Sequence, residues 1–229
     1  MTVDVPHKCP VAPLEMAFTL DRHFRRLGRR DQVELVYTYP INRVHSLAPV
    51  ADWASAEFER RGILYETFFN VERVDPEARV VYSAEGGQYA YDLLISVPPH
   101  RGARVVADSG LGDEQGFVPT DRYTLRARDY PNVFVVGDAT NLPVSKAGST
   151  AHYQAEVVAD SIASALEGDS SMARYDGKVF CFIEAGGDEG TYIEFSYTRP
   201  PRPVRPSSLL HQLKLACNEL YWLSARAVL

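Results

Sequence analysis

Two cysteines of this sequence lie in segments whose residue types suit thiol chemistry. Cys9 lies in the loop HKCPVAPLE, residues 7–15, where His7 and Lys8 flank the thiol. Positive or titratable neighbours of this kind favour the reactive thiolate. Cys181 stands between two phenylalanines in a strand-like stretch. Either cysteine alone is more often a small buried residue, so a redox interpretation depends on the two acting together.

The loop that carries Cys9 also argues against a dinucleotide site. It follows a short strand and precedes a helix, the position at which a nicotinamide-binding domain carries a glycine-rich turn. Residues 6–13 hold His, Lys, Cys and prolines instead of glycines. Their backbone could not approach a pyrophosphate closely. We therefore expect a thiol where such a domain would bind a phosphate.

Residues 133–163 carry the strongest signal, in the string VFVVGDATNLPVSKAGSTAHYQAEVVADSIA. A buried strand is predicted to deliver Asp138 to its C-terminal end, where open α/β sheets bind ligands. A carboxylate there can accept a hydrogen bond from a sugar or ribityl hydroxyl. The helix that begins near 147–149 offers free N–H groups and partial positive charge, which Lys146 would strengthen. The plainer alternative is a strand–loop–helix crossover with an aspartate N-cap.

Positions 1–98 alternate between strand-like and helix-like patterns. Helices with apolar residues at helical spacing are predicted up to Gly28 and over 52–62, with Gly62 as the second stop. Strands are predicted over 33–40, 63–75, 78–86 and 89–99. This order of strand, helix, strand, helix, strand is typical of an α/β dinucleotide-binding domain.

The remaining chain continues with a helix, two strands and a tail. The helix is predicted over 147–166 and the strands over 178–185 and 191–198. RPPRPVRPSS is predicted as a stiff extended linker, because each proline fixes its φ. In the tail, Leu209, Leu213, Ala216, Leu220 and Leu223 share one helical face, whereas His211, Lys214 and Asn218 lie elsewhere.

Composition and charge narrow the functional class. The 229 residues are 45% hydrophobic and carry a net charge of −6, a globular composition that does not suggest nucleic acid. From Arg199 to the end, the chain contains five basic residues, the last of them Arg226, and one acidic residue, Glu219. This net +4 tail on an acidic body suggests an anionic membrane surface as partner. No run reaches the ~20 apolar residues of a bilayer span, no signal peptide is recognisable, and no metal site is expected.

Three motifs in a fixed order resemble one family. The K-C-P-x-A-P-x-E loop, the VGDAT…SKAG segment and the C-F-I-E strand are similar to those of sulfide:quinone oxidoreductases and of the flavoprotein subunit of flavocytochrome c sulfide dehydrogenase. The 133–163 string by itself resembles the second FAD-binding motif of the pyridine nucleotide-disulfide oxidoreductase superfamily. The resemblance covers nearly the whole chain, including the amphipathic tail.

The resemblance implies specific roles for residues of this chain. Cys9 and Cys181 would be the redox pair on one face of the flavin, holding a disulfide or sulfur chain. FAD would contact the positions Gly137, Asp138, Lys146, Ala147 and Gly148. Phe180 and Tyr221 would flank a quinone. Sulfide or a sulfane-sulfur donor would be the substrate. Residues 207–229 would attach the protein peripherally to the cell membrane, and a homo-oligomer is compatible with the family.

The resemblance also implies a fold: the glutathione-reductase-like flavoprotein fold with two dinucleotide-binding domains, truncated at the N-terminus. Residues 1–98 would form a degenerate nucleotide-binding-like domain with the first cysteine. Residues 99–168 would form the second part of the FAD-binding domain, and 169–229 a C-terminal region with the second cysteine and the tail.

Two features depart from the family pattern. The G-x-G-x-x-G unit that binds the ADP part of FAD is missing, and Gly110, Gly112 and Gly116 follow a loop, so we interpret them as turn glycines. We therefore expect a fragment that by itself binds FAD poorly. Cys217 does not match the family's third cysteine and is interpreted as a small apolar residue. Two alternatives stay open: a type II NADH:quinone oxidoreductase-like flavoprotein, and a non-catalytic α/β module.

Overall fold

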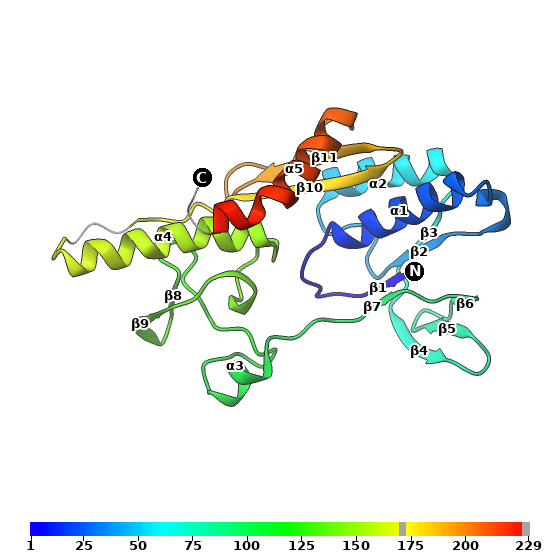
Figure 1. The fold of residues 1–229 in the computed structure, drawn as a ribbon. Helices are drawn as coiled ribbons and strands as arrows, with labels where there is room; N and C mark the ends of the chain where they lie inside the picture. The colour runs from blue at the N-terminus through cyan, green and yellow to red at the C-terminus, as the bar shows by residue number, and fades with distance from the viewer. Residues whose placement is uncertain (170–172, 226–229) are drawn as a thin grey trace.

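A parallel sheet of four strands organises the first part of the chain. The computed structural model describes residues 1–169 and 173–225 and has a mixed α/β fold (Figure 1). The sheet order is β3-β2-β1-β7, and every pairing in it is parallel. Its strands are β1 (Thr2–Val3), β2 (Val36–Tyr39), β3 (Leu64–Thr67) and β7 (Ser96–Val97). The predicted alternation of strands and helices is thereby confirmed.

Two helices cover this sheet. α1 (Ala12–Arg26) connects β1 to β2, followed by a short 3-10 turn, η1 (Arg30–Gln32), and α2 (Ala48–Arg61) connects β2 to β3. Gly62 takes a left-handed φ of 67° at the end of α2 and Gly28 a φ of 63° after α1, as predicted from their positions. The helices meet through Phe18 and Phe58, whose ring centroids are 5.3 Å apart.

The segments 63–75 and 89–99 each form two strands, so the prediction of one continuous strand in each was wrong. After β3, Phe68 adopts a φ of 55° and turns the chain, while Phe69 is fully buried. An antiparallel sheet follows, made of β4 (Val71–Asp75), β5 (Val80–Ser83) and β6 (Gln88–Ala90). Residues 91–95 then lead back to β7 in the parallel sheet.

The central part of the chain consists of short elements and one long helix. It contains α3 (Arg104–Asp108), β8 (Arg126–Ala127), β9 (Tyr130–Phe134), the 3-10 turn η2 (Gly137–Ala139) and α4 (Gly148–Leu166). The helix over 147–166 is confirmed. The strand before Asp138 was expected to be buried, and this expectation was wrong. Because β9 pairs only with β8 in a two-stranded sheet, its first residues are exposed, and burial begins only at Val135.

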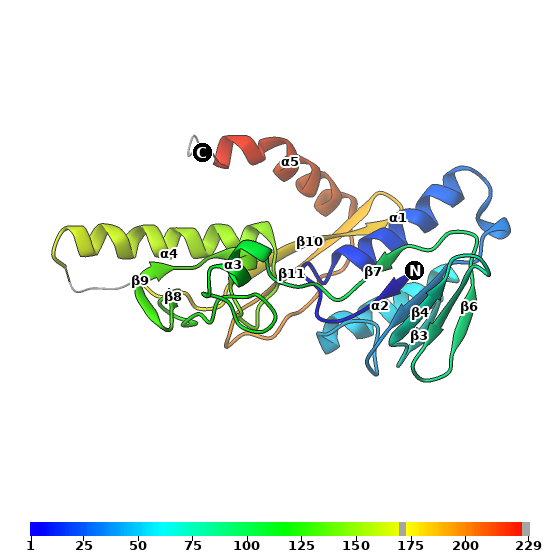
Figure 2. The same ribbon diagram turned by 90° about the horizontal axis from the view of Figure 1, so that it is seen from below.

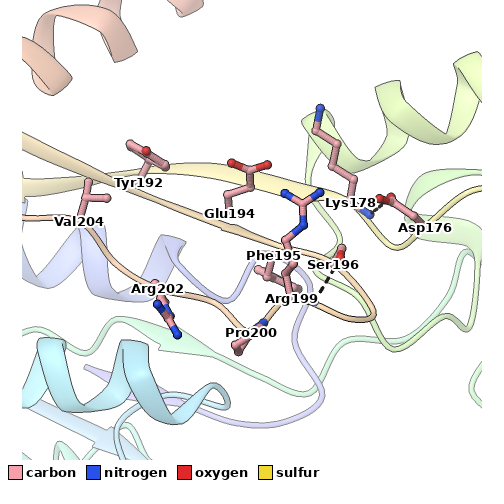
Figure 3. Close-up of a pocket in the computed structure, with 10 residues that line it drawn as sticks. All are labelled: Asp176, Lys178, Tyr192, Glu194, Phe195, Ser196, Arg199, Pro200, Arg202 and Val204. Carbon is pink, nitrogen blue, oxygen red and sulfur yellow. Dashed lines mark hydrogen bonds between the residues drawn. The ribbon is translucent and has the colours of Figure 1, made fainter.

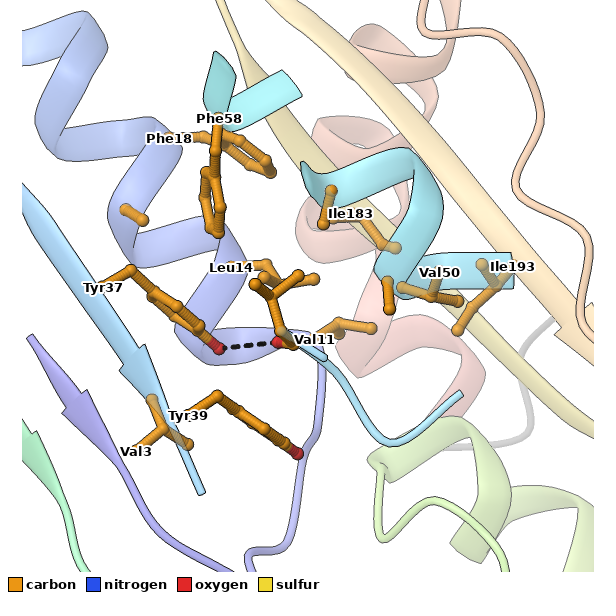
Figure 4. Packing of buried hydrophobic residues seen from close by; sticks show 14 of the residues in the cluster. Val3, Val11, Leu14, Phe18, Tyr37, Tyr39, Val50, Phe58, Ile183 and Ile193 are labelled. Atoms are coloured by element: carbon orange, nitrogen blue, oxygen red, sulfur yellow. Dashed lines mark hydrogen bonds between the residues drawn. The ribbon is translucent and has the colours of Figure 1, made fainter. Parts of the chain in front are cut away.

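The last two strands return to the first domain. The two predicted strands, β10 (Val179–Gly186) and β11 (Glu189–Phe195), form an antiparallel pair, with Cys181 opposite Ile193. Alternate residues of β10 face inward, and Cys181, Ile183 and Ile193 join the same core as Phe18 and Tyr37 (Figure 4). The core therefore unites the two ends of the sequence.

The tail helix α5 (Ser208–Ala225) packs against β11 and lies on the outside of the molecule (Figure 2). Its buried side is polar. His211 is 7% exposed and its Nδ1 lies 2.8 Å from Glu184 Oε1, and Lys214 forms an ion pair with Glu15. The apolar face predicted for this tail is exposed to solvent, with Leu209 and Trp222 both at 67%. Arg226 and residues 227–229 lie outside the described residues.

A buried carboxylate ties α1, α2 and the hairpin together. Asp21 is fully buried on α1 and accepts hydrogen bonds from Arg25, Arg30 and Arg61 at 2.7–3.2 Å. Arg61 of α2 also donates to the carbonyl of Ala185 on β10. Burial would raise the pKa of Asp21, but the three guanidinium groups outweigh it and hold the pKa below its usual value.

We expect Asp21→Asn to lower the free energy of unfolding by about 3 kcal/mol, because removing one partner leaves buried charge unpaired. Urea denaturation measures the change, with Asp52→Asn on the exposed side of α2 as the control. Since the folded-state pKa of Asp21 is depressed, its contribution is present above about pH 4 and is lost as pH falls through that lower pKa. A variant as stable as the wild type at pH 7 would contradict the role of this cluster.

Candidate active site

The loop predicted to be reactive places Cys9 directly before α1. The thiol is partly buried against the main core, and the backbone N–H of Ala12 lies 3.4 Å from the Cys9 carbonyl oxygen. Burial raises the pKa of the Cys9 thiol, and the first backbone amides of the helix, at Val11 and Ala12, oppose the rise. Cys9 therefore sits at a helix N-terminus that favours its anionic form but in surroundings that favour the neutral thiol.

The neighbours expected to promote the Cys9 thiolate do not do so. His7 is held neutral, because burial lowers its pKa to about 4, and its Nε2 lies 2.9 Å from the Tyr39 hydroxyl. Lys8 turns away and pairs with Asp138 at 3.3 Å. The sequence-based expectation that His7 and Lys8 activate the thiol was thus wrong, since His7 is uncharged near neutral pH and Lys8 is paired with Asp138.

Cys181 approaches the same place from the other end of the chain. It lies on the inward face of β10, is 7% exposed, and belongs to the core cluster that Cys9 packs against. Burial raises the pKa of Cys181 to about 11; the nearby Cys9 thiol adds to the rise, and the Ser145 and Ser149 hydroxyls oppose it. The fold therefore makes neighbours of the two predicted redox residues, which are both free thiols here.

The N-terminus of α4 lies beside Cys181. Ser149, in the first turn of α4, donates a hydrogen bond to the carbonyl of Phe180. The cap residue Ala147 is extended and no side chain caps the helix, so the proposal of an aspartate N-cap is excluded. Gly148 begins the helix, and the buried Thr150 hydroxyl has no hydrogen-bond partner. This end of α4 thus keeps donors available for an acceptor from outside the chain.

Asp138 and Lys146 lie near this helix end. The Asp138 side chain is 51% exposed and is tied to the cysteine loop through Lys8. Gly137 has a φ of 64°, and its N–H donates to the buried Gln154 side chain at 2.6 Å. Lys146 donates to the Thr140 carbonyl and lies 4.7 Å from the Phe117 ring centroid; burial lowers its pKa.

Two cavities flank the cysteine loop. One, of about 280 Å³, has Lys146 and Asn141 in its wall, and the other, of about 390 Å³, has Tyr39 and Ser145; both are lined by His7 and Lys8. Donors at α4, the Asp138 carboxylate and these cavities suit the flavin-ring half of FAD.

The described residues do not offer a comparable site for the ADP half. Gly110, Gly112 and Gly116 lie in a turn after α3, not after a strand, as the sequence indicated. Gly116 approaches Gly102 so closely that a Cβ on Gly102 would lie 1.8 Å from the Gly116 carbonyl oxygen. Gly112 and Gly116 thus allow close backbone packing, and Gly110 adopts a left-handed φ of 73° in the turn.

The residues predicted to flank a quinone lie on separate elements. Phe180 is on the outer face of the hairpin, stacked on Tyr192 with ring centroids 5.2 Å apart. Tyr221 is on α5, half exposed, with its ring 5.2 Å from that of Trp222. Sequence reasoning missed Phe182 and Tyr192, which complete the aromatic cluster with Phe180. The alternation along β10 was the signal that could have found them.

A further cavity of about 660 Å³ lies beside β11, between that strand and the proline-rich linker (Figure 3). Tyr192 of the aromatic cluster and the basic residues Lys178, Arg199 and Arg202 contribute to its lining. The linker forms no helix or strand of its own, as its prolines predicted, and its Val204 N–H lies 3.4 Å from the Tyr192 carbonyl. Aromatic and cationic groups thus meet next to the hairpin.

The sequence was compared with known proteins. The chain is similar to mitochondrial sulfide:quinone oxidoreductases of Mus musculus (26% identical over 89% of this chain) and Schizosaccharomyces pombe (27% over 85%). The relative in Dictyostelium discoideum is 28% identical over 83%. The matches span 46%, 44% and 43% of these relatives, so the chain spans about half of their length. No protein-family model matches it.

Solved structures show the same fold. The sulfide:quinone oxidoreductase of Aquifex aeolicus superposes with a TM-score of 0.81 at 18% identity, covering 97% of this chain and 57% of that one. A chain of the Tetrahymena thermophila mitochondrial ATP synthase gives a TM-score of 0.69 at 22% identity, covering 86% and 50%. The molecule is thus a mixed α/β protein that resembles part of a sulfide:quinone oxidoreductase. It is similar to the C-terminal part of these sulfide:quinone oxidoreductases.

We expect the three thiols to react with iodoacetamide at pH 8 in the order Cys217, Cys9, Cys181. Cys217 is exposed, Cys9 is partly buried, and Cys181 is buried with its pKa raised to about 11. Peptide mass spectrometry over time measures each rate separately. In mild oxidant, Cys9 and Cys181 should become linked, with the Cys217→Ser variant showing the same product. Rapid alkylation of Cys181, or linkage only to Cys217, would contradict the arrangement described.

Proposed function

We propose that this chain carries the thiol and flavin-ring part of an FAD-dependent oxidoreductase that passes two electrons from sulfide, or a related sulfur donor, to a membrane quinone. The observation that supports this most is that Cys9 packs against the core that contains Cys181 and, together with burial, raises the pKa of Cys181, beside the uncapped N-terminus of α4. The similarity to sulfide:quinone oxidoreductases suggests the chemistry, and the site has residue types that suit it.

The thiol step would begin from the Cys9–Cys181 disulfide. Hydrosulfide attacks one sulfur, a new S–S bond forms there as a persulfide, and the old bond breaks to leave the other sulfur as thiolate. Around Cys9 the backbone amides of α1 would stabilise that thiolate, and around Cys181 the Ser145 and Ser149 hydroxyls would do so. Because Cys181 is buried and Cys9 partly buried, this local support would help either sulfur to carry negative charge.

FAD, when bound, would accept the two electrons and supply the redox chemistry. Asp138 would accept a hydrogen bond from a ribityl hydroxyl. Ala147 and Gly148 would present backbone N–H groups, with Lys146 adding positive charge beside them. Gly137 would keep the turn tight before Asp138, since a Cβ there would lie 3.0 Å from the Ala151 Cβ.

The hairpin surface and α5 would form the quinone and membrane side of the enzyme. Phe180 and Tyr221 remain our proposed quinone contacts, with Tyr192 added by the aromatic cluster. The apolar residues of α5 face outward, and the linker before them is basic, which suits peripheral attachment to an anionic bilayer through residues 207–229. No helix of the described residues is long and apolar enough to cross a membrane.

The domain assignment follows from the same proposal. Residues 1–98 would be the nucleotide-binding-like domain of a glutathione-reductase-like fold, 99–168 the second part of its FAD domain, and 169–229 the C-terminal region. The parallel sheet with α1 and α2 supports the first of these.

A second candidate is a non-catalytic α/β module. Two observations favour it: a chain of similar fold occurs in a solved ATP synthase assembly, and no ADP-binding turn is found among the described residues. The third candidate, an NADH-dependent enzyme, is disfavoured by the loop before α1, which lacks glycines and is occupied by Cys9.

The purified chain is mixed with excess FAD and then desalted. We expect it to retain clearly less than one flavin per chain. We expect sulfide, but not NADH, to bleach the flavin that is retained. Cys9→Ser and Cys181→Ser should keep the flavin and lose the bleaching, because only the thiol relay is removed. Cys217→Ser is the matched control and should behave as the wild type. Absorbance near the flavin maximum follows both steps. Bleaching by NADH would favour the NADH-dependent enzyme. A chain that retains no flavin and is colourless would favour the non-catalytic module.

We expect the chain to bind anionic vesicles and to release partly in high salt. Each basic residue near the surface contributes about 1 kcal/mol, which salt screens, whereas apolar burial at about 25 cal/mol per Å² persists. Replacing the exposed Leu220 and Trp222 by Glu should reduce flotation with vesicles without changing the thermal unfolding midpoint. Leu93→Glu, which is more exposed and lies outside the tail, is the control. Undiminished flotation of the tail variant would show that the tail is not the anchor.

A further inference from the structure

The tail helix docks on the thiol region through one cation. Lys214 Nζ forms an ion pair with Glu15 Oε1, and both side chains are largely buried, at 19% and 24% exposure. Glu15 lies in the first turn of α1, the helix that begins directly after Cys9. The tail helix, from the far end of the sequence, therefore brings a positive charge to the start of the helix that supports the Cys9 thiol.

Glu15 is fixed in place by more than this ion pair. Its Oε1 accepts the backbone N–H of Glu184 at 2.6 Å. The Glu184 carboxylate lies 2.8 Å from His211 Nδ1 and 3.9 Å from both Lys214 and Arg22. The cations of this cluster come from α1 and α5, so undocking α5 would leave Glu15 without a cation among its described contacts.

The charge of this pair reaches Cys9. Burial is the main influence on the Cys9 thiol, and beyond the backbone amides Glu15 raises its pKa while Lys214 lowers it. Glu15 acts in the same direction on Cys181. The other charged group of the loop, Lys8, is engaged with Asp138, and His7 is neutral. Glu15 and Lys214 are thus the two side chains that act on Cys9 with opposite sign.

We propose that Lys214 is a positioning residue that acts on Cys9 through Glu15, so that the Cys9 thiol is more nucleophilic when the tail helix is docked. This rests on the proposed function only in giving Cys9 a redox role. The helix is docked by its polar residues while its leucines face outward, so the docked position leaves the apolar face free for a surface. The thiol site would then respond to the state of the tail.

The pH profile of Cys9 alkylation tests this without FAD or sulfide. In a Cys217→Ser background, the full chain is treated with iodoacetamide between pH 6 and 10, and the Cys9 peptide is quantified. We expect Lys214→Met to move the midpoint upward, with alkylation at pH 8 slower by about threefold. Glu15→Gln should move the midpoint downward by a similar factor, because the carboxylate that opposes the thiolate is gone.

Three further variants separate electrostatics from packing. Lys214→Arg keeps the charge and should keep the wild-type midpoint, and the double variant Glu15→Gln/Lys214→Met should lie near it. Lys178→Met, an exposed lysine that stacks on Tyr153, is the matched control. A change of access alone would alter the plateau rate at high pH and not the midpoint. Shifts of the same sign for Lys214→Met and Glu15→Gln, or no shift in either, would overturn the proposal.

Should Lys214→Met fail to fold by circular dichroism, Glu15→Gln and Lys214→Arg still decide the matter, since the first must lower the midpoint and the second must leave it unchanged. Failure of sulfide oxidation would not touch this result, because alkylation needs neither flavin nor sulfide. Conversely, if the chain is redox-active but the alkylation midpoints of the variants do not shift, the proposed function stands and the role of Lys214 is excluded.

Discussion

One buried carboxylate holds together the elements on which the candidate site depends. Asp21 accepts from three arginines, and one of them, Arg61, also reaches the Ala185 carbonyl of β10. A buried charge is costly unless every bond to it is made, so α1, α2 and the hairpin are constrained to one relative position. That position packs the Cys181 strand against α1. The apolar core around Phe18 and Ile183 provides the attraction, and the charge cluster selects the geometry.

Burial governs the electrostatics of the two thiols more strongly than any single charged neighbour. It raises the pKa of both cysteines and lowers that of His7, so the groups nearest in sequence cannot ionise readily. The groups that oppose this effect of burial on the cysteine pKa values lie on several elements. Backbone amides of α1, hydroxyls at the start of α4 and the ammonium of Lys214 all act from different parts of the chain. A site of this kind depends on tertiary packing for its chemistry.

The tail shows an inversion of the usual amphipathic arrangement. A helix on a globular protein commonly buries its apolar face, yet α5 docks through His211 and Lys214 and exposes its leucines and Trp222. Ion pairs hold such a contact more weakly than apolar burial would, because water competes for them. The arrangement therefore leaves the apolar face of α5 free to contact something other than its own domain.

Local patterns in the sequence were sufficient for much of the secondary structure. Helical spacing and stop glycines located α1, α2 and α4, and alternating residues located β10 and β11, because these signals depend on near neighbours. The motifs also indicated the resemblance to sulfide:quinone oxidoreductases, which the comparisons found as well. The breaks at Phe68 and in residues 91–95 were missed, since a turn inside an apolar run leaves no periodic trace. Only the tertiary structure decided that Lys8 pairs with Asp138 and not the thiol, and that Lys214 meets Glu15. Such pairings join residues far apart in the chain, and long-range packing sets them where no local pattern can.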